Sequence, residues 1–507
     1  MLAAIRSAAV IGIEAVPVTV EVDAARGLPL WLIVGLAAGA VKESKERLGA
    51  ALVNSGFVLP PRRVTVGLAP GDLPKTGTAY DLPVALAYLA ATGQLPAERL
   101  EGLMAVGELG LDGTLRPVRG ILPVARHAAV SGVRMLVVPP ANLAEACLVE
   151  GLRVTTATTL AELGEALRSG DLSPIAEPPA GAASGPESRD DFADVVGQGA
   201  AKRALEIAAA GAHACLLIGP PGTGKTMLAR RLPSILPALT RQEALEATSI
   251  HSVAGLLPPA GGLLPARPFR APHHTISAAG LVGGGSVPRP GEVSLAHNGV
   301  LFLDELLEFP RHVLEALRQP VEDGRVVIAR AAMSVAFPAS FTLVAAANPC
   351  PCGHAGDPQR PCRCTEADVA RYRGRLSGPL SDRLDMHVTV GPVALRSLGK
   401  AGCEERSSTI RERVEQARLR QRERYRSLPG VEVNARVPGR WLDMHGGLEP
   451  SARERLATAA ERLALSARAY HRVLRVARTV ADLDGQEVVD ERAVMEALRY
   501  RPAERVG

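Results

Sequence analysis

The sequence predicts an α/β protein with more than one domain and a helical C-terminal region. Short stretches rich in Val, Ile and Leu alternate with helical patterns along most of the chain, and such alternation is typical of α/β folds. The 507 residues, 47% of them hydrophobic, are enough to bury more than one core. The stretch "DLSPIAEPPAGAASGPESRD" at 171–190 has no apolar period and is rich in Pro, Ala, Gly and Ser. We interpret it as a flexible linker between two α/β domains.

The region before the linker, residues 1–170, is predicted to be the first domain, an α/β or α+β sandwich. It opens with "MLAAIRSAAVIGIEA" and continues with the alternating stretch "VPVTVEVD", which favours a strand over a signal peptide. Further along, "DLPVALAYLAATG" has the character of a helix, and "LMAVGELGLDGTLRPV" that of short strands. We therefore expect a sheet covered by helices in this domain.

Charge and composition exclude some classes of protein. The net charge of +5 is small for this length, so any basic surface must be local. No run of about 18 uninterrupted apolar residues is present, so we expect no membrane span and a cytoplasmic protein. The seven cysteines are unevenly spaced, which indicates free thiols or a metal site rather than a disulfide framework.

After the linker, the sequence runs through a helix, the apolar strand "ACLLI", a Gly-rich loop and another helix. The loop fits the pattern G-x-x-x-x-G-K-[ST], in which backbone N–H groups surround a polyphosphate at a helix N-terminus. Lys225 is expected to contact the β- and γ-phosphates, and Thr226 to coordinate Mg²⁺. The predicted nucleotide-binding residues are Gly219, Pro220, Pro221, Gly222, Thr223, Gly224, Lys225 and Thr226.

Two later strands supply polar residues for the same site. The strand in "GVLFLDELLEF" ends at Asp304, predicted to hold Mg²⁺, and Glu305, predicted to polarise the attacking water. The strand in "FTLVAAAN" ends at Asn348, where an amide could contact a γ-phosphate or water. The alternative for Asp304 and Glu305 is a strand followed by a capped helix. The alternative for Asn348 is an ordinary turn residue at the end of a strand.

Four cysteines follow Asn348 in the stretch "NPCPCGHAGDPQRPCRC". Tetrahedral thiolate ligation is typical of structural Zn²⁺, although Cys-x-Cys pairs depart from the usual Cys-x₂₋₄-Cys spacing. His354 is a spare ligand, and four reduced surface thiols are the alternative. The predicted ligands are Cys350, Cys352, Cys362 and Cys364.

These motifs, together with "LSGPLSDRLDMHV" and "SARAYHRVLRVARTVADL", resemble the AAA+ ATPases of the magnesium-chelatase and MCM-like branch. The whole chain, including "GLAPGDLPKTGTAYDLP" and "RPFRAPHHTISAAGLVGGG", is similar to the bacterial ComM/YifB family. The resemblance implies an AAA+ core at 191–395, with a Cys-rich insertion at 350–364, and a helical lid at 396–507.

The resemblance also implies roles for two arginines. Arg383 corresponds to the arginine finger that enters the neighbouring subunit's site, and Arg468 to the sensor-2 arginine of the lid. Arg475 and Arg478 lie on the same helix and are rival candidates for sensor 2.

The resemblance, and not the spacing of the residues, implies a function. ComM-like proteins are hexameric, ATP- and Mg²⁺-dependent motors that act on single-stranded or branched DNA without sequence specificity, and promote branch migration in natural transformation. The alternatives are a magnesium-chelatase motor subunit and an ATP-dependent protease-like remodeller.

Two segments are candidates for the pore of such a ring, where cations would contact a phosphate backbone. The first is "RPFRAPHHTISAAGLVGGGSVPRPGE", in which the "PHH" residues are equally consistent with a structural loop. The second, "EDGRVVIARAAMSVAF", is hairpin-like. The candidate residues are Arg267, Arg270, His273, His274 and Arg289 in the first segment and Arg325 and Arg330 in the second.

The first domain resembles the proteolytic domain of Lon, on "LPKTGTAYDLP" and "LRPVRGILPVARHAA". Ala79 occupies the position of the catalytic Ser and Val124 that of its Lys, and neither side chain can act as nucleophile or base. We therefore expect a Lon-like domain that lacks the dyad. Thr78, beside the lost Ser, is a residual nucleophile without an obvious base.

Overall fold

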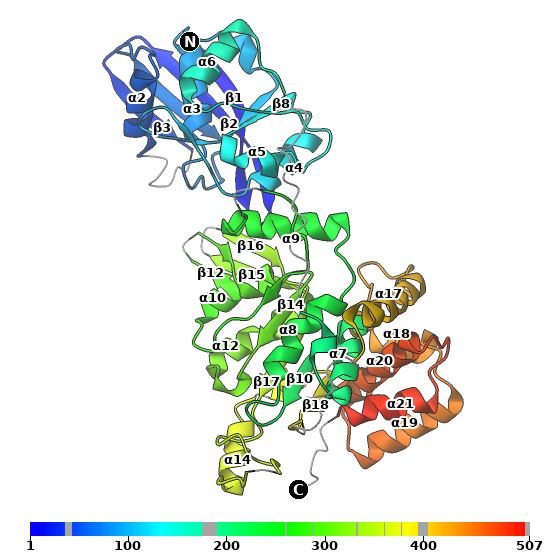
Figure 1. The fold of residues 1–507 in the computed structure, drawn as a ribbon. Coiled ribbons are helices and arrows are strands. Elements are labelled where there is room, and N and C mark those ends of the chain that lie inside the picture. The colour runs from blue at the N-terminus through cyan, green and yellow to red at the C-terminus, as the bar shows by residue number, and fades with distance from the viewer. Residues whose placement is uncertain are drawn as a thin grey trace.

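The computed structural model describes most of the chain. The described residues are 1–35, 43–174, 190–258, 261–285, 287–330, 333–358, 360–376, 378–393 and 404–501. An N-terminal α/β body lies above a second α/β body, and a group of helices packs against the side of the second body (Figure 1).

The N-terminal body is built on a seven-stranded mixed sheet in the order β3-β4-β2-β1-β5-β8-β9. Its strands are β1 (Leu2–Ile11), β2 (Glu14–Ala25), β3 (Leu30–Val34), β4 (Arg63–Ala69), β5 (Leu103–Ala105), β8 (Met135–Val138) and β9 (Val154–Thr156), with the short β6 (Glu108–Leu109) and β7 (Leu115–Arg116) outside it. Its helices are α2 (Ser44–Asn54), α3 (Asp81–Ala91), α4 (Ile121–Val130), α5 (Leu143–Ala146) and α6 (Leu160–Ser169).

The opening segment forms a strand, as its alternating pattern predicted. β1 pairs antiparallel with β2 along its whole length, so its apolar side chains reach the core on one face. Helix α3 is buried at every position, which explains its almost wholly apolar sequence. Val124 is buried on α4, and the Thr78 hydroxyl donates to the Glu108 carboxylate. The Lon-like character of this body stays a prediction.

The second body contains a five-stranded parallel sheet in the order β11-β14-β17-β10-β18. Helices cover both faces, which is why its main strands read as continuous apolar runs. The strands are β10 (Cys215–Ile218), β11 (Phe269–Arg270), β14 (Val300–Leu303), β17 (Thr342–Ala347) and β18 (Met386–Thr389). The α-helices of this body include α7 (Gly199–Gly211), α8 (Lys225–Ile235), α9 (Arg241–Ala254), α12 (Arg311–Ala316), α13 (Arg318–Asp323), α14 (Glu366–Arg373) and α15 (Gly378–Ser381).

Two hairpins extend from this body. β12 (Gly283–Gly284) pairs with β13 (Arg289–Pro290), between the short helices α10 (Ala278–Val282) and α11 (Glu292–Leu295). β15 (Arg325–Arg330) pairs with β16 (Met333–Pro338), which confirms the predicted hairpin. Gly324 ends α13, so β15 begins directly after that helix, and residues 331–332 between the two strands lie outside the described residues.

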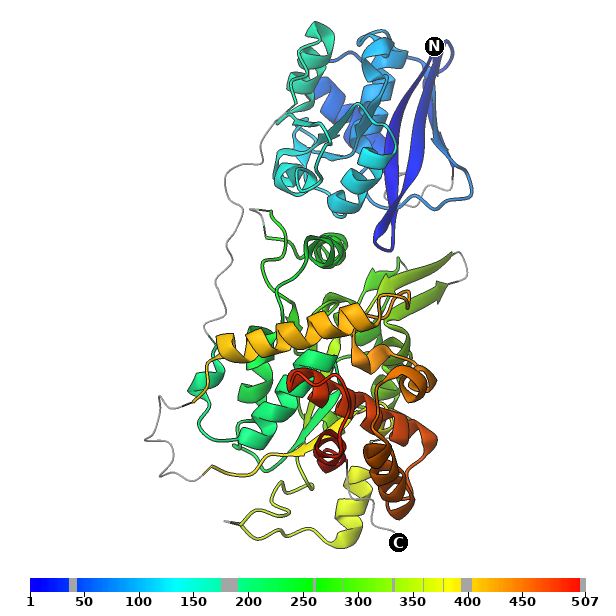
Figure 2. The ribbon, with the colours of Figure 1, turned by 90° about the vertical axis from the view of Figure 1, so that its right-hand side faces the viewer.

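The C-terminal helices form the lid: α17 (Ser407–Arg424), α18 (Gly439–His445), α19 (Pro450–Arg462), α20 (Ala467–Leu483) and α21 (Glu491–Arg499). Helix α17 lies across the core helices (Figure 2), and the apolar face of α20 belongs to the same hydrophobic cluster as strand β10. Lid and core therefore share one hydrophobic core, and the predicted α/β fold class is confirmed.

The predicted domain boundaries fall largely outside the described residues. Most of the linker at 171–190 falls on residues 175–189, and the boundary at 395/396 falls on residues 394–403, neither of which the structure describes. The division into 1–170, 191–395 and 396–507 stays a prediction.

Helix α9 lies between the two bodies (Figure 1). Glu145 of the N-terminal body accepts hydrogen bonds from the Leu122 N–H, at 2.8 Å, and from the Ser252 hydroxyl of α9. The tip of the β1–β2 hairpin is directed at the β15–β16 hairpin (Figure 2), where a Cβ on Gly12 would lie 3.0 Å from the Ala336 carbonyl oxygen. The N-terminal body is thus packed against the hairpin side of the second body.

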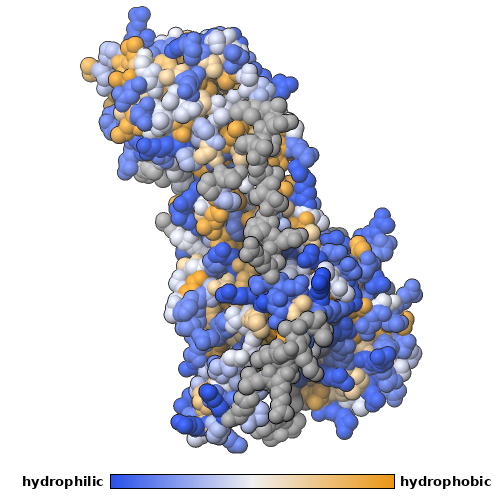
Figure 3. Space-filling model, in the orientation of Figure 1, coloured by the Kyte–Doolittle hydropathy of each residue, from blue (hydrophilic) through white to orange (hydrophobic). Residues whose placement is uncertain are grey.

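On the face shown in Figure 3, hydrophobic residues are scattered among hydrophilic ones over both bodies. Within the described part of the chain, no helix is long and apolar enough to cross a membrane.

Candidate nucleotide-binding site

The Gly-rich loop connects the end of β10 to the first residue of α8. Gly222 and Gly224 have φ angles of +77° and +87°, in the left-handed region that glycine adopts without strain. A Cβ on Gly219 would lie 2.0 Å from the Val390 carbonyl oxygen, so a larger residue does not fit there. These glycines are therefore required for the loop's conformation as well as for close approach of a phosphate.

Lys225 and Asn348 meet in this loop. The Lys225 Nζ donates to the carbonyl oxygens of Gly219 and Pro220, at 2.7 and 2.9 Å, and to Asn348 Oδ1 at 3.3 Å. Burial lowers the pKa of Lys225, and the carboxylates of Asp304 and Glu305 act in the opposite direction. The ammonium is therefore held at the mouth of the loop, where a bound phosphate would replace carbonyl partners with a stronger anionic one.

Thr226 and Asp304 form the predicted magnesium pair. The Thr226 hydroxyl donates to Asp304 Oδ2 at 2.7 Å, and Asp304 follows directly after β14. A hydroxyl and a carboxylate at this separation fit Mg²⁺, which prefers oxygen ligands and keeps several waters. Thr226 and Asp304 would hold the ion, and Mg²⁺ would supply positive charge that neutralises the phosphates of a bound nucleotide.

Glu305 has an unusual backbone and an unexpected partner. Its φ angle is +52°, rare for a residue with a side chain, and its carboxylate is half exposed. The Nδ1 atom of His274 lies 3.2 Å from Glu305 Oε2. His273 and His274 line a cavity of about 240 Å³ together with Thr226, Asp304 and Glu305.

The histidine contact is one that sequence reasoning missed. The "PHH" stretch had two interpretations, a DNA contact or a structural loop, and neither placed His274 beside the predicted base. No local spacing signals the contact, because His274 follows β11 and Glu305 follows β14, two strands that are adjacent only in the sheet.

A larger cavity of about 960 Å³ lies beside the loop. Gly219, Pro220 and Asn348 line one part of it, and Ala355 and Gly356 of the Cys-rich insertion line another. The structure thus brings together the loop, the lysine, Thr226, Asp304 and Glu305, and their roles in a nucleoside triphosphate site stay predictions.

Comparison with known proteins identifies the family. Three family models match consecutive segments: "Subunit ChlI of Mg-chelatase" at residues 20–142, "Magnesium chelatase, subunit ChlI" at 191–398 and "Magnesium chelatase, subunit ChlI C-terminal" at 404–501. Competence protein ComM of Haemophilus influenzae is 43% identical over 509 residues, covering 99% of this chain and 97% of that protein. The uncharacterized protein YifB of Escherichia coli is 42% identical over 506 residues, covering 100% and 98%. The chain belongs to the ComM/YifB family of magnesium-chelatase-like AAA+ proteins.

A chelatase subunit is a more distant relative of this ComM/YifB chain. The magnesium-chelatase 38 kDa subunit of Rhodobacter capsulatus is 29% identical over 188 residues, which cover 33% of this chain and 53% of that protein. The family resemblance predicted from the motifs is thus confirmed, and the likeness to ComM and YifB extends over the full length.

The two predicted catalytic arginines of the ComM/YifB chain do not lie in this site. Arg383 pairs with Glu322, in the last turn of α13, and lines a separate cavity of about 460 Å³ together with Arg472 and Arg475. Arg468 is exposed in the first turn of α20. A finger that acts on a neighbouring subunit must lie outside its own nucleotide site. The placement of Arg383 agrees with that role, and both assignments stay predictions.

The rival sensor-2 candidates have other partners. Arg478 is 1% exposed, pairs with Asp482 at 3.0 Å and donates to lid carbonyl groups such as that of Glu487. Arg475 donates to the Val437 carbonyl at 2.9 Å. Arg478 is therefore a structural residue of the lid, and Arg468 stays our prediction for sensor 2.

Two of the candidate pore arginines are also structural. Arg267 pairs with Glu243 at 3.1 Å, and Arg270 with Glu292 at 2.6 Å. Both guanidiniums are thus paired with carboxylates of the same chain, and their role as DNA contacts stays a prediction. Arg289, Arg325 and Arg330 are exposed on the two hairpins, and a Cβ on Gly284 would lie 3.6 Å from the Arg330 guanidinium.

We expect His274→Ala to lower the turnover number for ATP several-fold while the KM stays nearly constant. The reason is that His274 contacts the carboxylate of Glu305 and not the phosphate loop, so its loss affects positioning of the predicted base rather than binding. Steady-state ATPase assays measure both constants. His445→Ala, an exposed histidine at the end of α18, is the matched control; equal effects of the two variants would contradict a specific role for His274.

Proposed function

We propose that this ComM/YifB protein is an ATP-driven DNA motor that works as a homohexamer on single-stranded or branched DNA and promotes branch migration, as in natural transformation. The proposal rests on the presence of two features in the same chain: a complete phosphate loop, and an arginine-finger candidate that lies away from it. We place such a motor in the cytoplasm, where ATP and incoming DNA meet.

The oligomer follows from the chemistry of phosphoryl transfer. Negative charge that develops on the transferred phosphoryl group needs a nearby cation, and an arginine finger is the usual one. Arg383 lies in a cavity separate from the one beside the phosphate loop. A ring of identical subunits would bring each Arg383 to the next subunit's site.

The proposed DNA contacts are the hairpin arginines. Arg289 of the β12–β13 hairpin and Arg325 and Arg330 of the β15–β16 hairpin are exposed. Aromatic residues make up 3% of the chain, so contacts to phosphates are favoured over base stacking. One relative is named a competence protein, which agrees with DNA uptake as the setting.

A chelatase-type motor is the second candidate. It is favoured by the family models, which are named for magnesium chelatase, and by the 29% identity to a chelatase subunit. A protease is disfavoured by Ala79 and Val124 at the predicted dyad positions.

We expect forked or single-stranded DNA to stimulate the ATPase, while a porphyrin-loaded partner and an unfolded protein do not. Substituting Arg289, Arg325 and Arg330 with Ala should weaken DNA binding and make its dependence on salt shallower, by about 0.7 in log–log slope for each phosphate on a single strand that is no longer neutralised. Arg455→Ala on the exposed face of α19 is the matched control. Fluorescence anisotropy over a salt series measures the slope, and stimulation by porphyrin alone would favour the chelatase candidate.

A further inference from the structure

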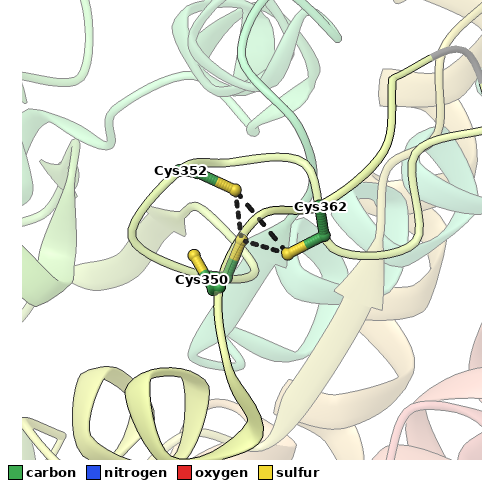
Figure 4. Close-up of side chains that lie close together, drawn as sticks. Cys350, Cys352 and Cys362 are labelled. Atoms are coloured by element: carbon green, nitrogen blue, oxygen red, sulfur yellow. Dashed lines mark hydrogen bonds between the residues drawn. The ribbon is translucent and has the colours of Figure 1, made fainter.

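The four cysteines of the insertion lie close together in space. Cys362, of the second Cys-x-Cys pair, is twelve positions from Cys350 and ten from Cys352, the members of the first pair. All four Sγ atoms lie within 4.8 Å of one another. Cys350 Sγ is 3.4 Å from Cys352 Sγ and 3.7 Å from Cys362 Sγ, and Cys352 Sγ is 3.6 Å from Cys362 Sγ (Figure 4). These separations are too long for disulfides, and the cysteines are free thiols.

The spacing of the sulfurs is that of a thiolate metal site. A Zn–S bond of about 2.3 Å in a tetrahedron puts neighbouring sulfurs about 3.8 Å apart. The Ala355 N–H also points at Cys350 Sγ, at 3.3 Å. His354 is not needed as a ligand, because its Nδ1 pairs with Asp357 at 3.0 Å.

The insertion has little else to hold its shape. Of residues 350–364, only Cys350 and Gly353 are buried among those that the structure describes, and Ala355 is the one aliphatic side chain apart from the prolines. A segment with no apolar core of its own needs a cross-link or a metal to offset the entropy cost of its ordering.

The first turn of the insertion touches the phosphate loop. Gly353 has a φ angle of +84°, and a Cβ there would lie 2.8 Å from Cδ of Pro221. Ala355 and Gly356 line the cavity beside Gly219 and Asn348. The 353–356 turn, between the two cysteine pairs, is therefore one wall of the proposed nucleotide site.

We propose that Cys350, Cys352, Cys362 and Cys364 bind one Zn²⁺ as four thiolates, and that the metal holds the 353–356 turn against the phosphate loop, so that metal content controls nucleotide affinity. The second half of this inference rests on the proposed ATP site, and the first half does not. Binding displaces the thiol protons to solvent and changes no oxidation state.

The test uses the full chain, purified without chelators or a metal-affinity column. Elemental analysis should find about one zinc ion per chain. Cys364→Ser should lose the metal, while Cys147→Ser, which removes a thiol from the N-terminal body, should keep it. Cobalt-loaded protein should show the intense visible bands of a tetrathiolate site, and zinc well below stoichiometry with four titratable thiols would overturn the proposal.

Nucleotide affinity tests the coupling. If loss of zinc leaves the turn folded in a tenth of the molecules, the affinity for a fluorescent ATP analogue falls roughly tenfold. Wild-type protein stripped of zinc should show the same decrease and recover when Zn²⁺ is added back, which separates the effect from misfolding of a variant. Lys225→Ala should lose nucleotide and keep zinc. Unchanged nucleotide affinity after stripping would overturn the coupling, and absence of ATP binding in zinc-loaded wild type would instead overturn the ATP site.

Discussion

Replacing Arg383 with Ala is expected to lower ATP hydrolysis by about 10³-fold, the range seen for arginine fingers, while nucleotide binding stays nearly unchanged. The guanidinium lies in a cavity apart from the chain's own phosphate loop, so its removal leaves the loop, Lys225 and the magnesium pair intact. What is removed is the cation that we propose stabilises charge on the transferred phosphoryl group in the neighbouring subunit. Turnover assays and titration with a fluorescent ATP analogue measure the two quantities.

Glu322→Gln is the matched control for Arg383, because it removes the charge of the residue that pairs with Arg383 and leaves the arginine in place. We expect this variant to hydrolyse ATP at close to the wild-type rate. A decrease as large as that of Arg383→Ala would indicate that the ion pair itself, and not the finger, matters.

Mixing Arg383→Ala with Lys225→Ala subunits tests action in trans. In a mixed ring, some interfaces combine an intact loop with an intact finger from the neighbour, so part of the ATPase activity should return. The proportion of the two variants is varied and the composition of the rings is verified by mass. A failure to recover activity in verified mixed rings would argue against a shared site.

Glu305→Gln is expected to reduce turnover by roughly 10²–10⁴-fold and to leave ATP bound, trapping the assembled ring. The amide is close to the carboxylate in size but cannot accept a proton from the attacking water. His274 Nδ1, at 3.2 Å, can still contact the amide oxygen, so the local geometry should persist. Single-turnover assays separate binding from chemistry.

Asp304→Asn supplies the comparison for Glu305→Gln. It removes a predicted Mg²⁺ ligand that accepts from Thr226 at 2.7 Å, so it should weaken binding of the Mg²⁺–nucleotide complex and not only its hydrolysis. Full turnover by Glu305→Gln would show that another group activates the water.

The sequence alone determined the features that depend on neighbours in the chain. A strand, a Gly-rich loop and a helix are consecutive, so the phosphate loop from Gly219 to Thr226 could be recognised from its pattern. The same holds for the apolar strand that directly precedes Asp304 and for the β15–β16 hairpin. Local spacing sets these elements, because their backbone hydrogen bonds and steric limits act over a few residues.

Only the tertiary structure decided which distant residues meet. The order of the parallel sheet brings His274 to Glu305, and the fold of the insertion brings Gly353 against Pro221. It also pairs Arg267 with Glu243 and Arg270 with Glu292. A charge pattern cannot reveal these pairs, because the sequence does not show whether an arginine is paired with a carboxylate or exposed to solvent. Such contacts are fixed by packing and crossover connections between elements far apart in sequence, and these carry no local signature.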